Sequence, residues 1–334
     1  MEKIATRVSY GQALKALGAT HPEVMVLDAD LSGVTMCNQF AAAYPERFFN
    51  MGIAEADMFG VAGGMASCGK TVFANTFAMF SAGRCWEQIR NGIAYPDLNV
   101  KVIGGHGGIS IGQDGATHQC IEDFGLMRTI PGMTVVCPCD DHEMKCAVAA
   151  LAEYPHTAYM RLGRMPVETV TDAVPGYRFE LGKGAVLRGG SDVTVIACGI
   201  MVQMALEAAE ALQAEGLSVR VIDMHTIKPL DKDAIVKAAK EPGRGAQCEG
   251  RTRRGGMRGR DAEGASARCA ARRARLLRPL RSPRGASGGI RPHGTGTGSI
   301  RPEGCGKEEI SSCTEGEKTA RPALCAPAGR FSAV

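Results

Sequence analysis

The sequence has no apolar run of the length that a membrane-spanning helix requires. Its stretches without a charged side chain, such as Met58–Gly69, fall far short of the roughly 20 residues that cross a bilayer. The first residues, Met-Glu-Lys-Ile-Ala-Thr-Arg, also lack the apolar segment of a secretory signal peptide. We therefore expect no contact with a membrane, a cytoplasmic location, and thirteen cysteines kept as reduced thiols.

Cysteine pairs at the spacing of a zinc site are missing as well. Cys137 and Cys139 form a C-x-C pattern on an apolar run, but no second pair follows at a suitable distance. The sequence therefore predicts structural thiols at these two positions and no metal site.

Large apolar residues are scarce in the last part of the chain. Residues 242–334 contain 17 Arg and 17 Gly, but only ten Val, Ile, Leu, Met, Phe, Tyr and Trp together. They hold 19 basic and 8 acidic side chains, whereas residues 1–241 hold 20 basic and 27 acidic ones. A segment with so little apolar surface cannot form a core, so we expect a disordered, Arg/Gly-rich tail over residues 242–334.

Strand-like and helix-like patterns alternate through the first half of the chain. The β-branched runs predict strands over residues 24–29, 71–77, 99–105, 133–138 and 157–161. The helical patterns lie between them, over residues 7–19, 53–67, 81–94 and 141–153. This alternation is typical of a parallel sheet with helices on its faces, so we expect a doubly wound α/β domain over residues 1–162.

A second, shorter α/β pattern follows a linker over residues 163–180, which is rich in turn-forming residues. It consists of a strand, a helix, a second strand and a helix that Asp231 would cap, over residues 192–198, 201–215, 218–222 and from 231 onward. A third strand is due after Glu241, but the pattern stops there. We therefore expect a truncated second α/β domain over residues 181–241.

Three polar or aromatic segments stand at predicted strand ends. The segment Gly104–Asp123 holds two histidines and an aspartate directly after a strand, where parallel sheets bind ligands; the alternative is a solvated surface loop. Glu55 begins an apolar helix, where it either complements the helix N-terminus or acts as a semi-buried acid. Phe77 and Phe80 suit either the core or a cofactor contact.

A glycine-rich string, Gly60-Val-Ala-Gly63-Gly64, lies inside the predicted helix over residues 53–67. It does not follow a strand, as a dinucleotide-binding fingerprint would, so it indicates close packing and not a phosphate-binding loop.

Four motifs in succession resemble the pyrimidine-binding domain of transketolases. They are Asp28-Ala-Asp30-Leu, Asn50-Met-Gly-Ile-Ala-Glu55, Thr76-Phe77-Ala-Met-Phe80, and His106 through Asp114-Gly-Ala-Thr-His118-Gln. The resemblance covers about residues 1–241. The 1-deoxyxylulose-5-phosphate synthases look similar around Glu55, but they typically carry a second histidine where this chain has Gln119, which favours transketolase. The beta subunits of 2-oxo acid dehydrogenases are a more distant alternative.

The resemblance implies a transferase of the pentose phosphate pathway that moves a two-carbon ketol unit from a ketose phosphate to an aldose phosphate with thiamine diphosphate. It implies three catalytic residues, Glu55, His106 and His118. It assigns the cofactor to Glu55, Phe77, Phe80 and Asp30. It assigns the sugar phosphates to Arg7, His106, Asp114, His118 and Arg161. The family serine that accompanies the phosphate contacts is not evident, because Val34 and Thr35 stand there.

A full-length transketolase begins with a domain that carries Gly-Asp-Gly and a later Asn and binds the diphosphate and its divalent ion. This sequence shows no such segment before the first motif. The resemblance therefore implies the C-terminal subunit of a split transketolase. It would be active only in a heteromer, with self-association in a heterotetramer, and the Mg²⁺ would be held by the N-terminal partner subunit.

Two interpretations of residues 242–334 remain. The resemblance implies that a strand and a Glu-His pair follow Glu241, whereas the excess of Arg, Gly, Ala and Pro is typical of GC-rich coding DNA read out of frame. We therefore expect a reading-frame shift near Glu241. The alternative, from a different class, is RNA binding through arginines such as Arg251 and Arg253 among glycines. Nucleic acid is the less expected partner because Phe331 is the only aromatic residue of this segment.

Overall fold

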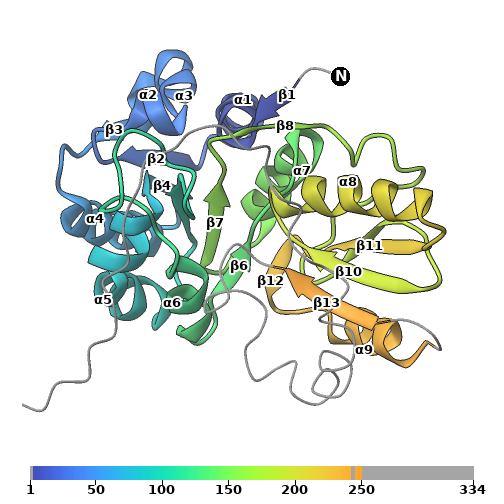
Figure 1. Cartoon of the computed structure of the whole chain (residues 1–334). Coiled ribbons are helices and arrows are strands. Elements are labelled where there is room, and N and C mark those ends of the chain that lie inside the picture. Colours follow the sequence, from blue (N-terminus) through green and yellow to red (C-terminus); the bar gives the residue numbers. More distant parts are fainter. Residues whose placement is uncertain (1–2, 242–244, 250–334) are drawn as a thin grey trace, which may run out of the picture. The chain divides into compact units, whose positions relative to one another are not determined.

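The computed structural model describes residues 3–241 and 245–249 (Figure 1). These residues lie in one compact unit, Met1–Arg278, and the second unit, Pro279–Val334, is outside the described part. No helix among the described residues combines the length and the apolar character that crossing a bilayer demands.

A seven-stranded sheet forms the centre of the first domain. Its strands follow the order β12-β6-β7-β5-β4-β2-β3, and all neighbours are parallel except β12, which runs antiparallel to β6. The strands are β2 (Val24–Asp28), β3 (Phe48–Asn50), β4 (Thr71–Phe77), β5 (Val100–Gly105), β6 (Thr134–Val136), β7 (Ala158–Leu162) and β12 (Thr226–Lys228). All five strands predicted for this region are present, and the predicted α/β fold with a parallel sheet is confirmed.

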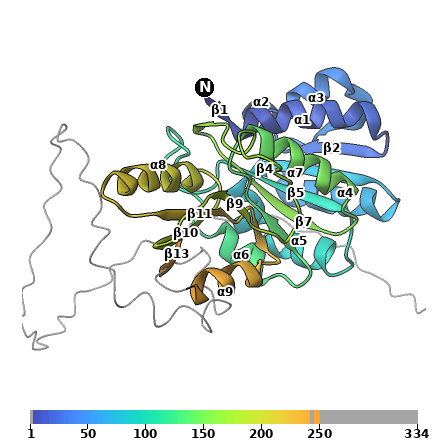
Figure 2. The same cartoon turned by 90° about the vertical axis from the view of Figure 1, so that its right-hand side faces the viewer.

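Helices bury both faces of this sheet, and each face has its own apolar core. The first core packs Tyr10, Phe40 and Val148 against the strands, and the second packs Phe59 and Phe124 against the other face. Figure 2 shows α1 and α7 on one side of the strands and α5 on the other. The helices of this domain are α1 (Thr6–Thr20), α2 (Ser32–Thr35), α3 (Asn38–Ala43), α4 (Glu55–Ser67), α5 (Trp86–Ile89), α6 (Asp123–Thr129) and α7 (Asp141–Glu153). Burial on both faces explains the near-continuous apolar sequence of the strands.

The segment predicted as one helix over residues 81–94 is divided. Wide π-helical turns at Met79–Arg84 and Arg90–Ala94 flank the short α5. Gly83 lies in the first turn, where an added Cβ would meet the Met79 side chain at 2.6 Å. Glycine weakens a regular helix, which accounts for the irregular turn. Because π-turns are common at functional sites, the loop after β4 is a candidate part of the functional site.

The second domain has a four-stranded sheet of order β13-β10-β11-β9. Its strands are β9 (Ala185–Arg188), β10 (Val193–Ala197), β11 (Val219–Asp223) and β13 (Gly245–Glu249), and its helices are α8 (Met201–Ala214) and α9 (Lys232–Lys240). Asp231 caps α9 as predicted, because its Oδ1 accepts a hydrogen bond from Ala234 N at 3.0 Å.

Three features differ from the sequence expectations. The predicted linker contains β8 (Pro166–Glu168), which pairs antiparallel with β1 (Lys3–Ala5). Strand β12, from the second half of the chain, completes the first sheet. The second domain does not stop at Glu241, because β13 pairs in parallel with β10 through backbone hydrogen bonds, which need no apolar side chains. The rest of the proposed frame-shifted tail, residues 250–334, lies outside the described residues.

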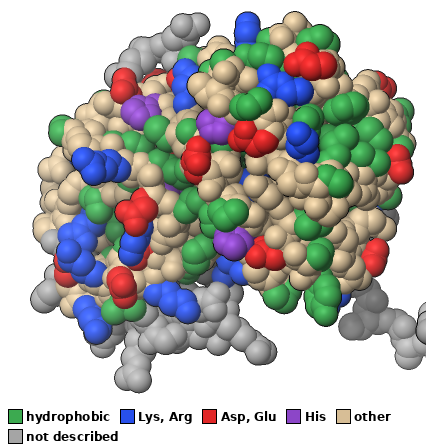
Figure 3. All heavy atoms as spheres, turned by 180° about the vertical axis from the view of Figure 1, so that it is seen from behind, with side chains coloured by type: hydrophobic (Ala, Val, Ile, Leu, Met, Phe, Trp, Pro, Cys, Tyr) green, Lys and Arg blue, Asp and Glu red, His purple; other side chains and the backbone are tan. Residues whose placement is uncertain are grey.

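Charged side chains of both signs are interspersed on the face of the molecule in Figure 3, with apolar side chains between them. On this face, the described residues therefore present no continuous basic surface of the kind that attracts a polyanion.

Candidate active site

Four loops leave the seven-stranded sheet at the same edge, where its parallel strands have their carboxyl ends. Phe77, Gly105 and Leu162 are direct cross-strand neighbours at the ends of β4, β5 and β7. Such an edge is where open α/β sheets bind ligands. The loops that follow these strands and β2 carry Asp30, Phe80, His106 and Arg164.

An aromatic and imidazole cluster occupies this edge. The Phe77 ring lies 5.8 Å from the Phe80 ring and 4.8 Å from the His106 ring, measured between centroids. His118 meets both phenylalanines edge-on, at 6.1 Å from Phe77 and 5.2 Å from Phe80. The structure thus brings together four of the predicted site residues from two separate motifs. Phe77 is buried and Phe80 is partly exposed, so the cluster has one open side.

His106 is held in an unusual backbone conformation. Its φ is 59°, in the left-handed region, and its amide donates to Leu162 O at 3.0 Å. The side chain is buried, and its Nδ1 has no hydrogen-bond partner among the described residues. Burial, followed by the nearby charges of Arg7 and Arg164, lowers the pKa of His106 to about 4. At neutral pH the imidazole is therefore uncharged and has one ring nitrogen available as an acceptor or donor.

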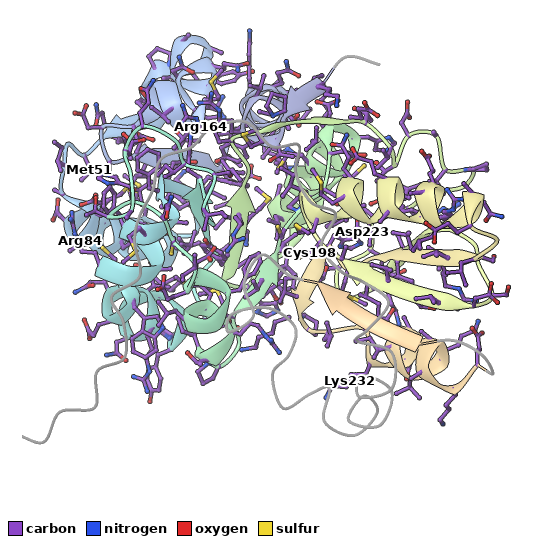
Figure 4. The ribbon with its side chains drawn as sticks, in the orientation of Figure 1. Met51, Arg84, Arg164, Cys198, Asp223 and Lys232 are labelled. Carbon is purple, nitrogen blue, oxygen red and sulfur yellow. The ribbon has the colours of Figure 1, made fainter. Side chains whose placement is uncertain are left out.

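Glu55 is the first residue of α4, and its side chain is only 3% exposed. Its Oε2 accepts a hydrogen bond from Arg84 Nη1 at 3.0 Å. The Arg84 side chain is 54% exposed, and its guanidinium carbon lies 4.7 Å from the centroid of the Phe80 ring. Figure 4 labels Arg84 beside the start of α4. The two roles suggested for Glu55, helix-end charge and semi-buried acid, are both compatible with this position.

Two arginines place positive charge beside His106. Arg7 and Arg164 each act on the His106 ring, and the charge of Arg164 helps to lower the pKa of Arg7, after the larger effect of burial. Arg7 Nη1 donates to Val34 O at 3.0 Å, so the residue in place of the family serine contributes its backbone carbonyl. No hydrogen bond or ion pair joins Arg164 to another described residue. Arg7 and Arg164 together offer an anion such as a phosphate two adjacent guanidinium groups.

Arg161, which the sequence predicts to contact the sugar phosphates, lies in a buried ion pair. This side chain is 4% exposed, and its Nε donates to Asp123 Oδ2 at 2.7 Å while its Nη2 pairs with the other carboxylate oxygen. Its guanidinium carbon also lies 3.6 Å from the centroid of the Phe124 ring. Asp123 and Phe124 therefore engage most of this guanidinium, although Arg161 also lines a cavity. Arg164, three residues later, is only partly buried and is the alternative that the sequence did not single out.

The loop after β5 contains several glycines. A β-bridge closes it, in which Gly108 N donates to Cys120 O at 2.6 Å. Asp114 lies exposed on this loop, and its charge raises the pKa of His106, against the larger lowering effects. Thr117 Oγ1 is 2.9 Å from His118 Nδ1, which orients the His118 ring. The loop thus presents Asp114 and His118 together as polar contacts for a ligand.

Asp30 stands at the outer end of the site. It adopts a φ of 62°, and its backbone N and carboxylate both hydrogen-bond to the Asn50 side-chain amide, at 3.1 and 3.2 Å. The buried Asp28 fixes this loop by accepting bonds from Leu31 N and Thr35 Oγ1. Two of the quoted motifs, around Asp30 and Asn50, are therefore in direct contact.

The glycine-rich string within α4 was predicted to allow close packing, and the structure shows such packing at one of its glycines. An added Cβ on Gly63 would meet Gly92 O at 3.0 Å, whereas none of the atoms considered lies within 4 Å at Gly60 or Gly64. Close approach of α4 to the turn at Gly92 therefore requires glycine at Gly63 alone.

The residues at this edge fit a planar, nitrogen-rich ring. The Arg84 guanidinium, itself planar, touches the buried Glu55 carboxylate and the face of Phe80 at once. An aminopyrimidine of thiamine diphosphate would use the same two contacts, a hydrogen bond to the carboxylate and stacking on the ring. A ring in this position would have to displace the partly exposed Arg84.

Comparison with protein families gives two matches. A model described as the transketolase pyrimidine-binding domain matches residues 2–169, and one described as the transketolase C-terminal domain matches residues 182–276. The second match, like β13, continues beyond Glu241. The predicted end of the second domain at that residue was therefore too early.

Relatives are found among single subunits and among longer proteins. A protein of Methanocaldococcus jannaschii described as a transketolase C-terminal section is 47% identical over 232 residues, which are 70% of this chain and 73% of the relative. One subunit of the apulose-4-phosphate transketolase of Phocaeicola vulgatus is 39% identical over 254 residues, 76% of this chain and 81% of the relative. Human transketolase-like protein 2 is 40% identical over 77% of this chain, but the match spans only 41% of that protein.

A solved structure described as the inactive β4 tetramer of a split-gene transketolase superimposes with a TM-score of 0.70 and 48% identity. The match covers 78% of this chain and 85% of that chain. The transketolase of Leishmania mexicana matches with a TM-score of 0.64 and 25% identity, over 74% of this chain and 38% of that chain.

Proposed function

We propose that this chain, which belongs to the transketolase family, is the C-terminal subunit of a split transketolase. It would transfer a two-carbon ketol unit from a ketose phosphate to an aldose phosphate with thiamine diphosphate and Mg²⁺. The observation that carries the proposal is the shared contact of one planar group with the buried Glu55 carboxylate and the Phe80 ring.

The chain's own residues have distinct parts in this proposal. Bound thiamine diphosphate supplies the electron sink for cleaving a carbon–carbon bond beside a carbonyl. Glu55 holds a proton at a pyrimidine ring nitrogen, in a setting that is nearly free of water. Phe77 and Phe80 hold the ring in place and exclude solvent from it. Asp30 lies at the matched position beside the cofactor.

Substrate recognition falls to the loop after β5 and to the two arginines. His106, uncharged at neutral pH, and His118 exchange hydrogen bonds with sugar hydroxyl and carbonyl oxygens as charge develops there. Asp114 accepts a hydrogen bond from a sugar hydroxyl. Arg7 and Arg164 bind the terminal phosphate, since guanidinium groups match its geometry.

Relatives named as separate sections or subunits support a partner for this chain. We therefore propose that an N-terminal subunit contributes the diphosphate and Mg²⁺ half of each site in a heterotetramer, and that the complex works in the cytoplasm on the sugars of the pentose phosphate pathway.

The test mixes the full chain with a separately purified N-terminal transketolase subunit. Ketol transfer should require both chains, thiamine diphosphate, Mg²⁺, a ketose phosphate donor and an aldose phosphate acceptor. Full activity of the chain by itself would contradict the split-subunit proposal. Formation of 1-deoxyxylulose 5-phosphate from pyruvate and glyceraldehyde 3-phosphate would favour the related synthase reaction.

A further inference from the structure

Three buried side chains with metal-binding chemistry meet outside the candidate active site. Cys139 follows β6, Glu143 lies in α7, and Asp223 ends β11. One ligand atom from each, the Cys139 thiol sulfur and a carboxylate oxygen from each acid, lies within 4.8 Å of the other two. We propose that Cys139, Glu143 and Asp223 bind one divalent transition-metal ion, and that zinc fits their chemistry best.

The Asp223 carboxylate is buried within this cluster. The side chain is fully buried, and neither carboxylate oxygen has a hydrogen-bond partner among the described residues. A buried carboxylate without a partner is costly, and a second carboxylate, that of Glu143, lies within reach. Without an ion, a proton shared with Glu143 and the Cys139 thiol are the side-chain contacts that the described residues offer the Asp223 carboxylate. A cation compensates both negative groups at once.

Glu143 is already oriented by its surroundings, as metal ligands commonly are. Its Oε2 accepts a hydrogen bond from Cys139 N at 2.7 Å, and its Oε1 accepts one from the Tyr177 hydroxyl. The backbone N of Glu143 donates to Asp140 Oδ1 at 2.9 Å, which fixes the start of α7. These outer contacts hold the carboxylate in place before any ion arrives.

A cavity gives an ion access to the cluster. Cys137, Cys139 and Cys198 are among the residues that line it. Cys198 directly follows Ala197, which is the cross-strand partner of Asp223. Figure 4 labels Cys198 and Asp223 at these adjoining strand ends. The cavity therefore leads to Cys139, one of the three proposed ligands.

The donor set selects among metals. Thiolate and carboxylate ligands together suit zinc and its close relatives, whereas Mg²⁺ and Ca²⁺ prefer sites made only of oxygen. Binding displaces the Cys139 thiol proton, which leaves to solvent, and the sulfur forms a bond to the metal. Three protein ligands leave the fourth tetrahedral position for water. This ion is distinct from the Mg²⁺ proposed for the partner subunit, and its binding does not depend on the proposed function.

Spacing rules could not find this site. They search for ligand pairs close in sequence, and the C-x-C pattern at Cys137 and Cys139 has no second pair. Asp223 belongs to the second domain and is distant from Cys139 in sequence, so the two residues are adjacent only in the folded chain.

The experiment uses the full chain, freed of metal with a chelator and then titrated with Co²⁺. We expect one equivalent to bind and to give the near-ultraviolet charge-transfer band of a cobalt–thiolate bond, and zinc to displace the cobalt. Elemental analysis of the chain as purified should find about one zinc per chain. The melting temperature should rise when zinc is added, because an ion that binds only the folded state stabilises it.

Two variants and a matched control locate the site. Cys139→Ser should abolish the charge-transfer band, and Asp223→Asn should weaken cobalt binding by at least about 100-fold. Cys68→Ser, at an exposed cysteine, should bind cobalt as the unchanged chain does. If a variant fails to fold, zinc-edge X-ray absorption of the unchanged chain decides, and should show one sulfur and otherwise oxygen ligands.

Failure of the unchanged chain to bind cobalt or zinc would overturn the proposal, as would equal binding by Asp223→Asn. Either result would indicate that Glu143 and Asp223 share a proton instead.

Discussion

Arg84 Nη1 lies 3.0 Å from Glu55 Oε2, so the one exposed side of a nearly buried carboxylate is covered by a side chain that is itself half exposed. The same guanidinium lies over the Phe80 ring. A ligand that needs both the carboxylate and the ring must first displace Arg84.

Arg84→Met should therefore strengthen binding of thiamine diphosphate to the complex with the partner subunit. A partly exposed ion pair contributes up to about 1 kcal/mol, which corresponds to about a fivefold lower Kd. The Kd of thiamine diphosphate is measured by a cofactor titration that is followed by protein fluorescence. Arg90→Met, at an arginine beside Trp86, is the matched control. Weaker binding in Arg84→Met would show that Arg84 holds the ligand and does not compete with it.

Glu55→Gln should lower ketol transfer by about 100- to 10,000-fold, because the amide keeps the size of the side chain but cannot exchange a proton. Cofactor affinity should change little. Steady-state kinetics and cofactor titration separate the two effects. Asp57→Asn, at an exposed carboxylate in the first turn of the same helix, should retain activity. Near-normal turnover in Glu55→Gln would leave Glu55 only the role of a helix-end charge.

Arg164→Ala and Arg161→Ala should have different effects. Loss of the Arg164 guanidinium should raise the KM for phosphorylated sugars by about 10- to 100-fold and change the KM for unphosphorylated ones much less. Loss of Arg161 leaves Asp123 buried and unpaired, so it should lower the free energy of unfolding by about 3–5 kcal/mol. Steady-state kinetics measure the KM values, and urea denaturation measures the free energy of unfolding. A stable Arg161→Ala chain with a selective KM defect would restore the original assignment.

The stability of the chain should fall in mild acid because of His106. Its pKa is about 4 in the folded chain, against 6.5 for the model imidazole, so between these values the unfolded state binds more protons. The free energy of unfolding should therefore decrease as pH falls through this window, by up to about 1.4 kcal/mol per pH unit. His106→Asn should remove this contribution, since asparagine tolerates a φ of 59°. An unchanged slope in denaturation series would assign the acid sensitivity to other groups.

Gly107→Ala should destabilise the loop after β5. An added Cβ would lie 2.4 Å from Arg161 Nε, a side chain that its ion pair holds in place, so we expect a loss of about 1–3 kcal/mol. Gly64→Ala, on the exposed face of α4 with none of the considered atoms within 4 Å of the new Cβ, should instead stabilise by about 0.5–1 kcal/mol. Thermal melts compare the two, and a neutral Gly107→Ala would mean that Arg161 is free to move.

The first sheet was predictable because its strands are buried on both faces, which gives continuous apolar runs such as Val24–Leu27. The choice between Arg161 and Arg164 as the phosphate contact could not be predicted. It depends on the ion pair of Arg161 with Asp123, which is distant in sequence and adjacent only in the fold. The π-turns around Phe80 and Arg84 have no sequence period of their own. Strand β13 was missed because its pairing with β10 uses backbone groups, and its composition gives no strand pattern.

Strand β12 has a consequence for synthesis on the ribosome. Because it covers β6, the first sheet keeps an open edge until residues Thr226–Lys228 have emerged, long after β7 is complete. Until then β6 can pair with the wrong strand of another nascent chain. Fragments that end in the linker should therefore associate with one another, and a shortened chain intended to isolate the first domain needs to retain the sequence through β12.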